Sequence, residues 1–239
     1  GDFVGIIGAT GSGKSTLITH MNGLNKPTSG KIIIDGTDVT KLGEHQRAAY
    51  IGRVFQDPMT GTAADMQIAE NLAIAARRGK GRTLRSGVSK KEKVQYAEML
   101  KELDLGLDTR LTSKVGLLSG GQRQAGTLLM ATMNKPKLLL LDEHTAALDP
   151  ATAEKVLELT KSIVAEKKIT CLMVTHNMHQ ALELGNRTLM MDAGRIVFDV
   201  KGEQRSKMTV DDLLEKFREN AGKNLDNDRI LLSKVEAGN

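Results

Sequence analysis

The feature that most constrains how this chain can fold is a glycine-rich loop at residues 8–16. Gly8, Gly13, Lys14 and Ser15 fit the pattern G-x-x-x-x-G-K-[ST], in which backbone N–H groups surround a phosphate chain. A helix that begins there adds its partial positive charge, while Lys14 supplies a point charge and Ser15 a hydroxyl ligand for Mg²⁺. A glycine-rich turn alone can be purely structural, but that alternative leaves the attached Lys and Ser unexplained. The loop therefore predicts nucleotide binding.

Apolar strand patterns and helical patterns alternate along the chain. Residues 3–7 are apolar and partly β-branched, as in a buried strand, and residues 16–21 read as the start of a helix. Such alternation favours an α/β fold with a mostly parallel sheet. Further strands are expected at residues 30–36, 53–58, 138–141, 169–174, 188–191 and 196–200, and helices at residues 64–76, 92–103 and 151–166.

The pattern changes divide the chain into three parts. A core is expected at residues 1–58 and 136–200, a helical subdomain at residues 59–135, and a C-terminal extension at residues 201–239. Because the sequence starts at Gly1 without an initiating Met, we expect a segment ahead of the core to be missing.

The C-terminal extension carries the pattern of one amphipathic helix. Thr209 and Asp212 have the spacing of a helix capping box. An apolar stripe follows, which is expected to pack on the core rather than to bind a partner; it consists of Val210, Leu213, Leu214 and Phe217.

Composition narrows the class of protein. Hydrophobic residues make up 40% of the 239 residues, enough for a large core, and the longest apolar run, near residues 138–141, is too short to span a bilayer. The single cysteine, Cys171, excludes an internal disulfide and fits a reducing compartment. The net charge of +5 is mild and the aromatic content is only 3%, so platforms for stacking nucleic-acid bases are scarce.

Two carboxylates follow the apolar run at residues 138–141, where an α/β sheet binds ligands. Asp142 is placed to hold Mg²⁺ through its water shell, and Glu143 to accept a proton from an attacking water. An ordinary surface Asp-Glu pair at a strand end is the alternative. The phosphate-binding loop upstream favours the functional interpretation.

A second candidate phosphate cradle lies about a hundred residues downstream of the first. Ser119, Gly120, Gly121 and Gln122 open a helical pattern, so a hydroxyl and N–H groups face its N-terminus. One triphosphate uses both loops only if they come from different molecules or if the chain folds one loop over the other.

In this order the motifs resemble the ATP-binding subunit of an ABC transporter, of the bacterial importer type, over residues 1–200. The resemblance implies a RecA-like P-loop NTPase core of mostly parallel sheet and a helical subdomain that carries the family signature. It makes residues 8–16 the Walker A loop, Asp142 the Walker B carboxylate and residues 147–150 the D-loop. It implies ATP as the bound nucleotide and Mg²⁺ as its cofactor.

The resemblance also assigns roles residue by residue. The implied catalytic residues are Glu143, His176 and Gln56. The implied nucleotide-contacting residues are Gly8, Ala9, Thr10, Gly11, Ser12, Gly13, Lys14, Ser15, Thr16, Ser119, Gly120, Gly121, Gln122 and Asp149. The implied Mg²⁺ ligands are Ser15, Gln56 and Asp142. His144 stands where the family commonly has Pro, and the aromatic residue that the family places upstream of Walker A to stack on adenine has no counterpart in the sequence.

The implied partners follow from the same resemblance. Two ATPase subunits, identical or merely similar, are expected to pair head to tail in the presence of ATP. Separate transmembrane permease subunits are expected to complete an importer, with or without a substrate-binding protein, and this chain is expected to be peripheral on the cytoplasmic face of the membrane. No nucleic-acid partner is expected.

Two other classes of function stay open at this point. One is a soluble ABC-type ATPase that acts on nucleic acid or ribosomes; the chain has no long coiled coil between Lys14 and Ser119, no zinc-type cysteine cluster and no second cassette. The other is a nucleotide-binding regulator without hydrolysis, and the presence of Glu143 argues against it.

Overall fold

The computed structural model describes residues 1–80 and 87–221. The described residues form two compact units, one of residues 1–19 with the described residues from 171 onward and one within residues 20–170. The predicted helical subdomain, residues 59–135, lies wholly inside the second unit; the three-part division itself stays a prediction.

The first unit is built on four strands in the order β6-β1-β7-β8. Strand β1 (Phe3–Gly8) is buried along its whole length and lies parallel to β6 (Thr170–Val174) on one side and to β7 (Arg187–Asp192) on the other. Strand β8 (Arg195–Lys201) returns antiparallel to β7. A central parallel strand is covered on both faces and therefore carries apolar residues on both. This is why the sequence alone predicted a strand at residues 3–7. Helix α1 (Lys14–Asn22) begins inside the glycine-rich loop.

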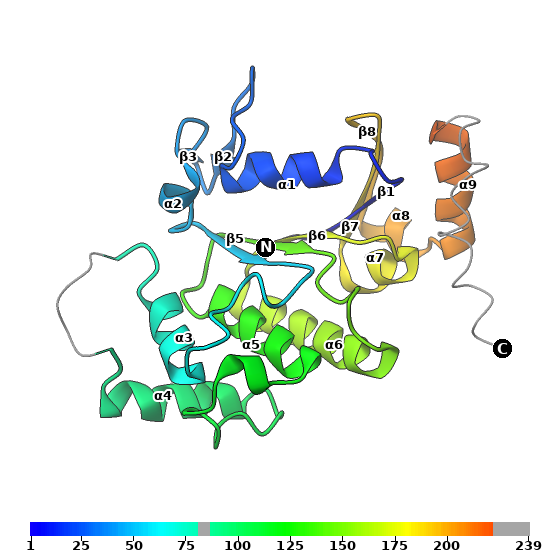
Figure 1. Ribbon diagram of the computed structural model, residues 1–239. Helices are drawn as coiled ribbons and strands as arrows, with labels where there is room; N and C mark the ends of the chain where they lie inside the picture. The colour runs from blue at the N-terminus through cyan, green and yellow to red at the C-terminus, as the bar shows by residue number, and fades with distance from the viewer. Residues whose placement is uncertain (81–86, 222–239) are drawn as a thin grey trace. The chain divides into compact units, whose positions relative to one another are not determined.

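The C-terminal segment packs on this first unit, as predicted. Helix α7 (Met178–Leu184) lies between β6 and β7, whereas α8 (Gly202–Ser206) and α9 (Val210–Ala221) follow β8, and α9 lies beside β8 (Figure 1). Thr209 and Asp212 form the capping box, with the Thr209 backbone N–H donating to Asp212 Oδ2 at 2.7 Å. Leu213 and Phe217 are buried in one cluster with Ile7 and Met190. The rest of the extension, residues 222–239, lies outside the described part of the chain.

The strands of the second unit differ from the expected ones at their ends. The segment predicted as one strand at residues 30–36 is a hairpin of β2 (Ile33–Ile34) and β3 (Thr37–Asp38). The segment predicted at residues 53–58 is β4 (Ile51–Val54), which begins earlier and stops before Phe55 because it pairs in parallel with β5 (Leu138–Asp142). The short helix α2 (Glu44–Arg47) precedes β4.

The remainder of the second unit is helical. It contains α3 (Ile68–Ala76), α4 (Lys90–Lys101), the 3₁₀ turn at Val115–Leu117, α5 (Gly120–Thr132) and α6 (Pro150–Lys167). Helices α3, α4 and α5 enclose one apolar core that includes Leu72, Tyr96, Leu100, Leu107 and Leu129. The basic loop between α3 and α4 falls partly on residues 81–86, outside the described residues.

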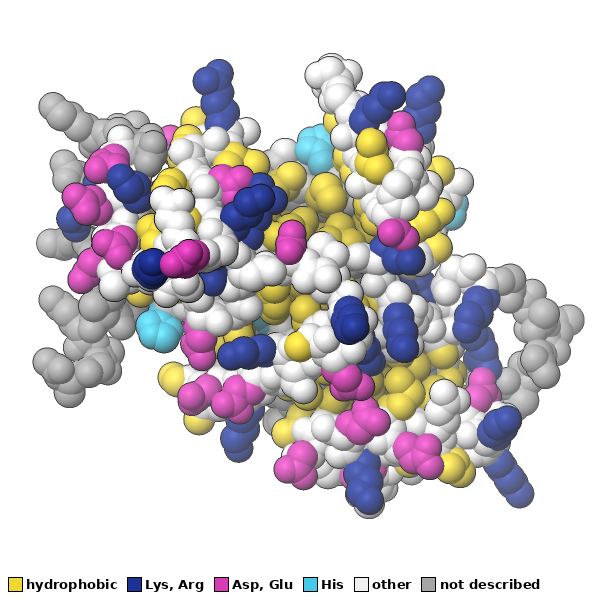
Figure 2. Space-filling view, turned by 180° about the vertical axis from the view of Figure 1, so that it is seen from behind, with side chains coloured by type: hydrophobic (Ala, Val, Ile, Leu, Met, Phe, Trp, Pro, Cys, Tyr) yellow, Lys and Arg dark blue, Asp and Glu magenta, His cyan; other side chains and the backbone are white. Residues whose placement is uncertain are grey.

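The surface carries charges of both signs. On the face shown in Figure 2, Lys and Arg side chains are interspersed with Asp and Glu side chains. In residues 1–80 and 87–221, no helix combines the length and apolar character that crossing a membrane requires.

Candidate functional site

The glycine-rich loop of the first unit closes around the Lys14 ammonium. Lys14 is buried, and its Nζ donates to the carbonyl oxygens of Gly8 at 2.7 Å and Ala9 at 2.8 Å. Gly8 has φ +154° and Gly13 has φ +103°, and a Cβ at Gly8 would meet the Met191 carbonyl oxygen. The loop therefore keeps the tight form that only glycine permits, with a cation inside it.

His176 lies at the same edge of the first unit's sheet as this loop. Strands β1 and β6 run parallel with Ile6 opposite Val174, so the chain leaves both strands at one edge. His176 is exposed there. Asn177 caps α7 by accepting from the Gln180 N–H at 3.1 Å, which fixes the chain just after His176. The structure thus brings together the predicted loop and the predicted histidine.

The second unit places the two predicted carboxylates at the end of β5. Asp142 is the last residue of the strand and forms an ion pair with Arg53 of β4 at 3.2 Å. Glu143 follows with φ 47°, a left-handed conformation that costs a non-glycine residue on the order of 1 kcal/mol and that is enriched at functional sites. Gln56 lies just beyond the parallel neighbour β4 and is exposed. Strand pairing therefore gathers Gln56, Asp142 and Glu143 at one edge.

Sequence reasoning missed Gln124, which connects these two segments. Its side chain on α5 is fully buried, and its Nε2 donates to the carbonyl oxygen of Phe55 at 3.0 Å and to that of His144. Gln124 thereby holds the residue before Gln56 and the residue after Glu143. The sequence offered one signal for this role: Gln124 is a polar residue on the apolar face of a predicted helix.

The predicted second cradle begins α5 as a helix cap. Ser119 Oγ accepts from the Gln122 N–H at 3.3 Å, and Gln122 Oε1 accepts from the Ser119 N–H at 3.2 Å. Ser119 and Gly120 are exposed, so the start of the helix is open to a ligand. Asp149 caps α6 in the same way, and hydrogen bonds from Thr152 lower its pKa.

Two polar residues near the site have structural roles. His144 is 2% exposed, and burial lowers its pKa to about 4. The Thr160 hydroxyl donates to the Val156 carbonyl, so its oxygen accepts from His144 Nε2 at 3.1 Å and the imidazole is the neutral Nε2–H tautomer. The Cys171 thiol is also buried, which raises its pKa and keeps it unreactive.

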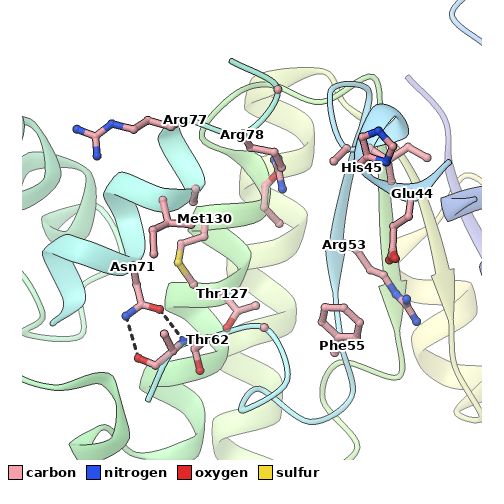
Figure 3. A pocket seen from close by; sticks show the side chains of 18 of the residues that line it. Glu44, His45, Arg53, Phe55, Thr62, Asn71, Arg77, Arg78, Thr127 and Met130 are labelled. Atoms are coloured by element: carbon pink, nitrogen blue, oxygen red, sulfur yellow. Dashed lines mark hydrogen bonds between the residues drawn. The ribbon is translucent and has the colours of Figure 1, made fainter. Parts of the chain in front are cut away.

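A groove of about 1640 Å³ opens on the second unit. It is lined by residues from α2, β4, α3 and α5, among them Arg53, Phe55 and Met130 (Figure 3). Asn71 closes one side by hydrogen bonds with both the N–H and the C=O of Ala63, at 2.8 and 3.1 Å. Positive groups outnumber the acidic side chains of Glu44 and Glu92 along its wall; they are Arg47, Arg53, Arg77, Arg78 and Lys80.

The donor groups suit a magnesium ion that comes with a phosphate ligand. Within residues 1–80 and 87–221, no three His, Cys, Asp or Glu side chains are grouped as a metal site of their own. In the second unit the carboxylate of Asp142 already holds a cation, the Arg53 guanidinium, and Gln56 carries a hard oxygen atom of the kind that Mg²⁺ prefers. In the first unit the Ser15 hydroxyl is an oxygen donor of the same kind. The residues therefore fit a magnesium ion with few protein ligands.

Comparison with known proteins gives a consistent result. The family model described as "ABC transporter" matches residues 1–146. The tyrosine transport ATP-binding protein of Clostridioides difficile is 48% identical over 217 residues, which cover 91% of this chain and 86% of that protein. The methionine import ATP-binding protein MetN of Corynebacterium diphtheriae is 37% identical over 202 residues, 82% of this chain. The chain spans 56% of the length of that methionine relative.

Solved structures agree with the sequence relatives. The ADP conformation of an ATP-binding cassette of an ABC transporter has a TM-score of 0.74 and 28% identity, and the match covers 90% of this chain and 87% of that one. A dimeric bacterial ABC transporter cassette has a TM-score of 0.69 and 32% identity, covering 84% of this chain and 85% of that one. The predicted P-loop NTPase fold with a helical subdomain is confirmed.

Proposed function

Because this chain belongs to the ABC transporter family, we propose that its hydrolysis of ATP drives the import of an amino acid through separate transmembrane subunits. The observation that carries the proposal is the 48% identity to a tyrosine transport ATP-binding protein over 86% of that protein's length. The alternative of an ATPase that acts on nucleic acid has no comparable support, since the relatives reported above are named for transport.

In this proposal the loop of the first unit holds the phosphates of ATP. Its residues are Gly8, Ala9, Thr10, Gly11, Ser12, Gly13, Lys14, Ser15 and Thr16. The Lys14 ammonium, now bound to carbonyl oxygens, would turn to the outer phosphates, and the backbone N–H groups of the loop and of the start of α1 would surround them. His176, exposed at the same edge, would contact the γ-phosphate.

Magnesium, when bound, would neutralise charge on the phosphate oxygens. Ser15, Gln56 and Asp142 would hold it. Glu143 would accept the proton of the attacking water, as a general base at the end of a buried strand. The left-handed backbone at Glu143 aims this side chain differently from a residue that continues the strand.

The open start of α5 would complete the ATP site of a second subunit. Ser119, Gly120, Gly121 and Gln122 form a capped helix N-terminus in which Ser119 and Gly120 are exposed, and Asp149 lies exposed at the start of α6. We propose a head-to-tail dimer that forms with ATP, of identical or merely similar subunits.

The groove on the second unit is the surface proposed for the transmembrane subunits. It is large enough for a short segment of another chain, and its wall reaches Phe55, next to Gln56. Its positive side chains favour a partner segment with acidic residues. In this proposal the chain is a peripheral subunit on the cytoplasmic face of the membrane, and a substrate-binding protein supplies the cargo on the other side.

Phosphate release by the purified chain with ATP and Mg²⁺ tests the catalytic assignment. Glu143→Gln removes the proton acceptor but keeps the shape, so turnover should fall at least about 100-fold while ATP binding is retained. Glu158→Gln, the same change at an exposed position of α6, is the matched control and should hydrolyse ATP normally. Unchanged turnover in Glu143→Gln would exclude this residue as the general base.

A further inference from the structure

We propose that Arg53 is an internal cation that competes with magnesium for Asp142, and so sets the magnesium concentration at which this protein binds ATP. The inference rests on the proposed function, because it needs Asp142 to serve the magnesium ion. It concerns a residue of the groove wall to which neither the sequence motifs nor the resemblance assigns a role.

The contact itself is a partly buried ion pair. Arg53 Nη2 donates to Asp142 Oδ2 at 3.2 Å, and the two side chains are 20% and 23% exposed. The pair joins neighbouring strands, since Arg53 lies opposite Leu140 in the β4–β5 ladder. A magnesium ion held by Asp142 would have to share this carboxylate with the Arg53 guanidinium or replace it.

The Arg53–Asp142 pair has fewer and longer hydrogen bonds than another Arg–Asp pair in the protein. Arg187 donates to both carboxylate oxygens of Asp199, at 2.8 and 2.6 Å. Arg53 makes a single bond to Asp142, and in the described part of the chain its buried Nε has no hydrogen-bond partner. A one-point contact that leaves a donor unsatisfied is weaker than a two-point one, so a divalent ion can displace it more easily.

A second contact would hold the Arg53 guanidinium after magnesium has displaced it from Asp142. Its Cζ lies 4.3 Å from the centre of the Phe55 ring, a cation–π distance, and Figure 3 shows the two side chains together on the groove wall. Arg53 can therefore release Asp142 without losing every favourable contact. Asp142 stays paired without magnesium, and the binding of magnesium must offset the loss of that pair.

The test is a magnesium titration of ATP binding, read by the fluorescence of methylanthraniloyl-ATP on the purified chain. In Arg53→Met, which keeps apolar contact with Phe55 but lacks the charge, the half-saturating MgCl₂ concentration should fall about fivefold. Affinity for the same nucleotide in EDTA should stay unchanged. A purely structural role for Arg53 would alter both affinities together.

Controls separate the possible results. Arg187→Met breaks the other Arg–Asp pair and should leave the titration unchanged, and Arg53→Lys, which keeps the charge, should stay within about twofold of the wild type. Circular dichroism checks that each variant is folded, and Arg53→Gln replaces Arg53→Met if the latter is not. If the wild type binds the nucleotide but neither uncharged variant shifts the titration, the inference is wrong; if the wild type does not bind it, the proposed function fails as well.

Discussion

At the scale of single residues, charge placement dominates the site. Lys14 is a buried ammonium held by carbonyl oxygens, and Asp142 is a partly buried carboxylate held by Arg53. Both of these groups therefore have a partner within their own unit. In the proposed function, binding of ATP and magnesium would exchange these internal partners for phosphate and metal, so the net affinity would be a difference between two sets of strong contacts.

The buried His144 predicts a loss of stability in acid. Its pKa in the folded chain is about 4, below the ordinary 6.5, so protonation favours the unfolded chain. The stabilisation is fully present above about pH 6.5 and is lost as the pH falls toward 4. The shift of the His144 pKa from 6.5 to about 4 corresponds to a total change of about 3 kcal/mol in the free energy of unfolding.

Urea unfolding of the intact chain at pH 7 and at pH 4.5 measures this effect. The variant His144→Gln keeps a donor for Thr160 but does not titrate, so its free energy of unfolding should depend less on pH than that of the wild type. Parallel losses of stability in the two proteins would show that His144 is not responsible.

Residues within local motifs were predictable, and residues that act across the chain were not. Residues 8–16 and Asp142 could be proposed from the sequence because each motif contains its own chemistry. Arg53 and Gln124 were missed because their partners lie 89 and 20 or more residues away in sequence. Contacts of this kind depend on strand pairing and helix packing, which one sequence does not reveal.

At the scale of elements, parallel pairing explains why the predicted residues gather. Each parallel strand delivers its following residues to one edge, so β1 and β6 collect the Lys14 loop and His176, and β4 and β5 collect Gln56 and Glu143. Strand ends were misjudged where pairing, rather than local composition, decides them. The expected strand continued to Pro58, where a proline would end it, but the paired part of β4 ends at Val54.

Helix α9 is predicted to be an integral part of the first unit. Phe217 is 2% exposed against Ile7 and Met190, so Phe217→Ala should lower the free energy of unfolding by about 3 kcal/mol. Leu214→Ala, a half-buried position on the same helix, should cost about 1 kcal/mol. Denaturant unfolding of the intact chain measures both changes, and equal, negligible effects would mean that α9 is only loosely attached.

At the scale of the whole molecule, the motifs are divided between the two units. The first unit contains the Lys14 loop and His176, and the second contains Gln56, the Ser119 helix cap, both carboxylates and Asp149. The order of motifs along the sequence was enough to predict the family and the fold class. It does not reveal the cargo or the membrane partner, because the residues that recognise the cargo are expected in other chains.

The most direct test of the central claim is uptake of radiolabelled tyrosine, methionine and other amino acids, each supplied separately, by cells whose chromosomal copy carries Lys14→Ala. Without the Lys14 ammonium the chain should no longer hold ATP, so uptake of one amino acid should fall to background. Lys155→Ala, at an exposed position of α6, should leave that uptake intact. Uptake that is the same in both variants for every amino acid would contradict the conclusion that ATP hydrolysis by this chain drives amino-acid import.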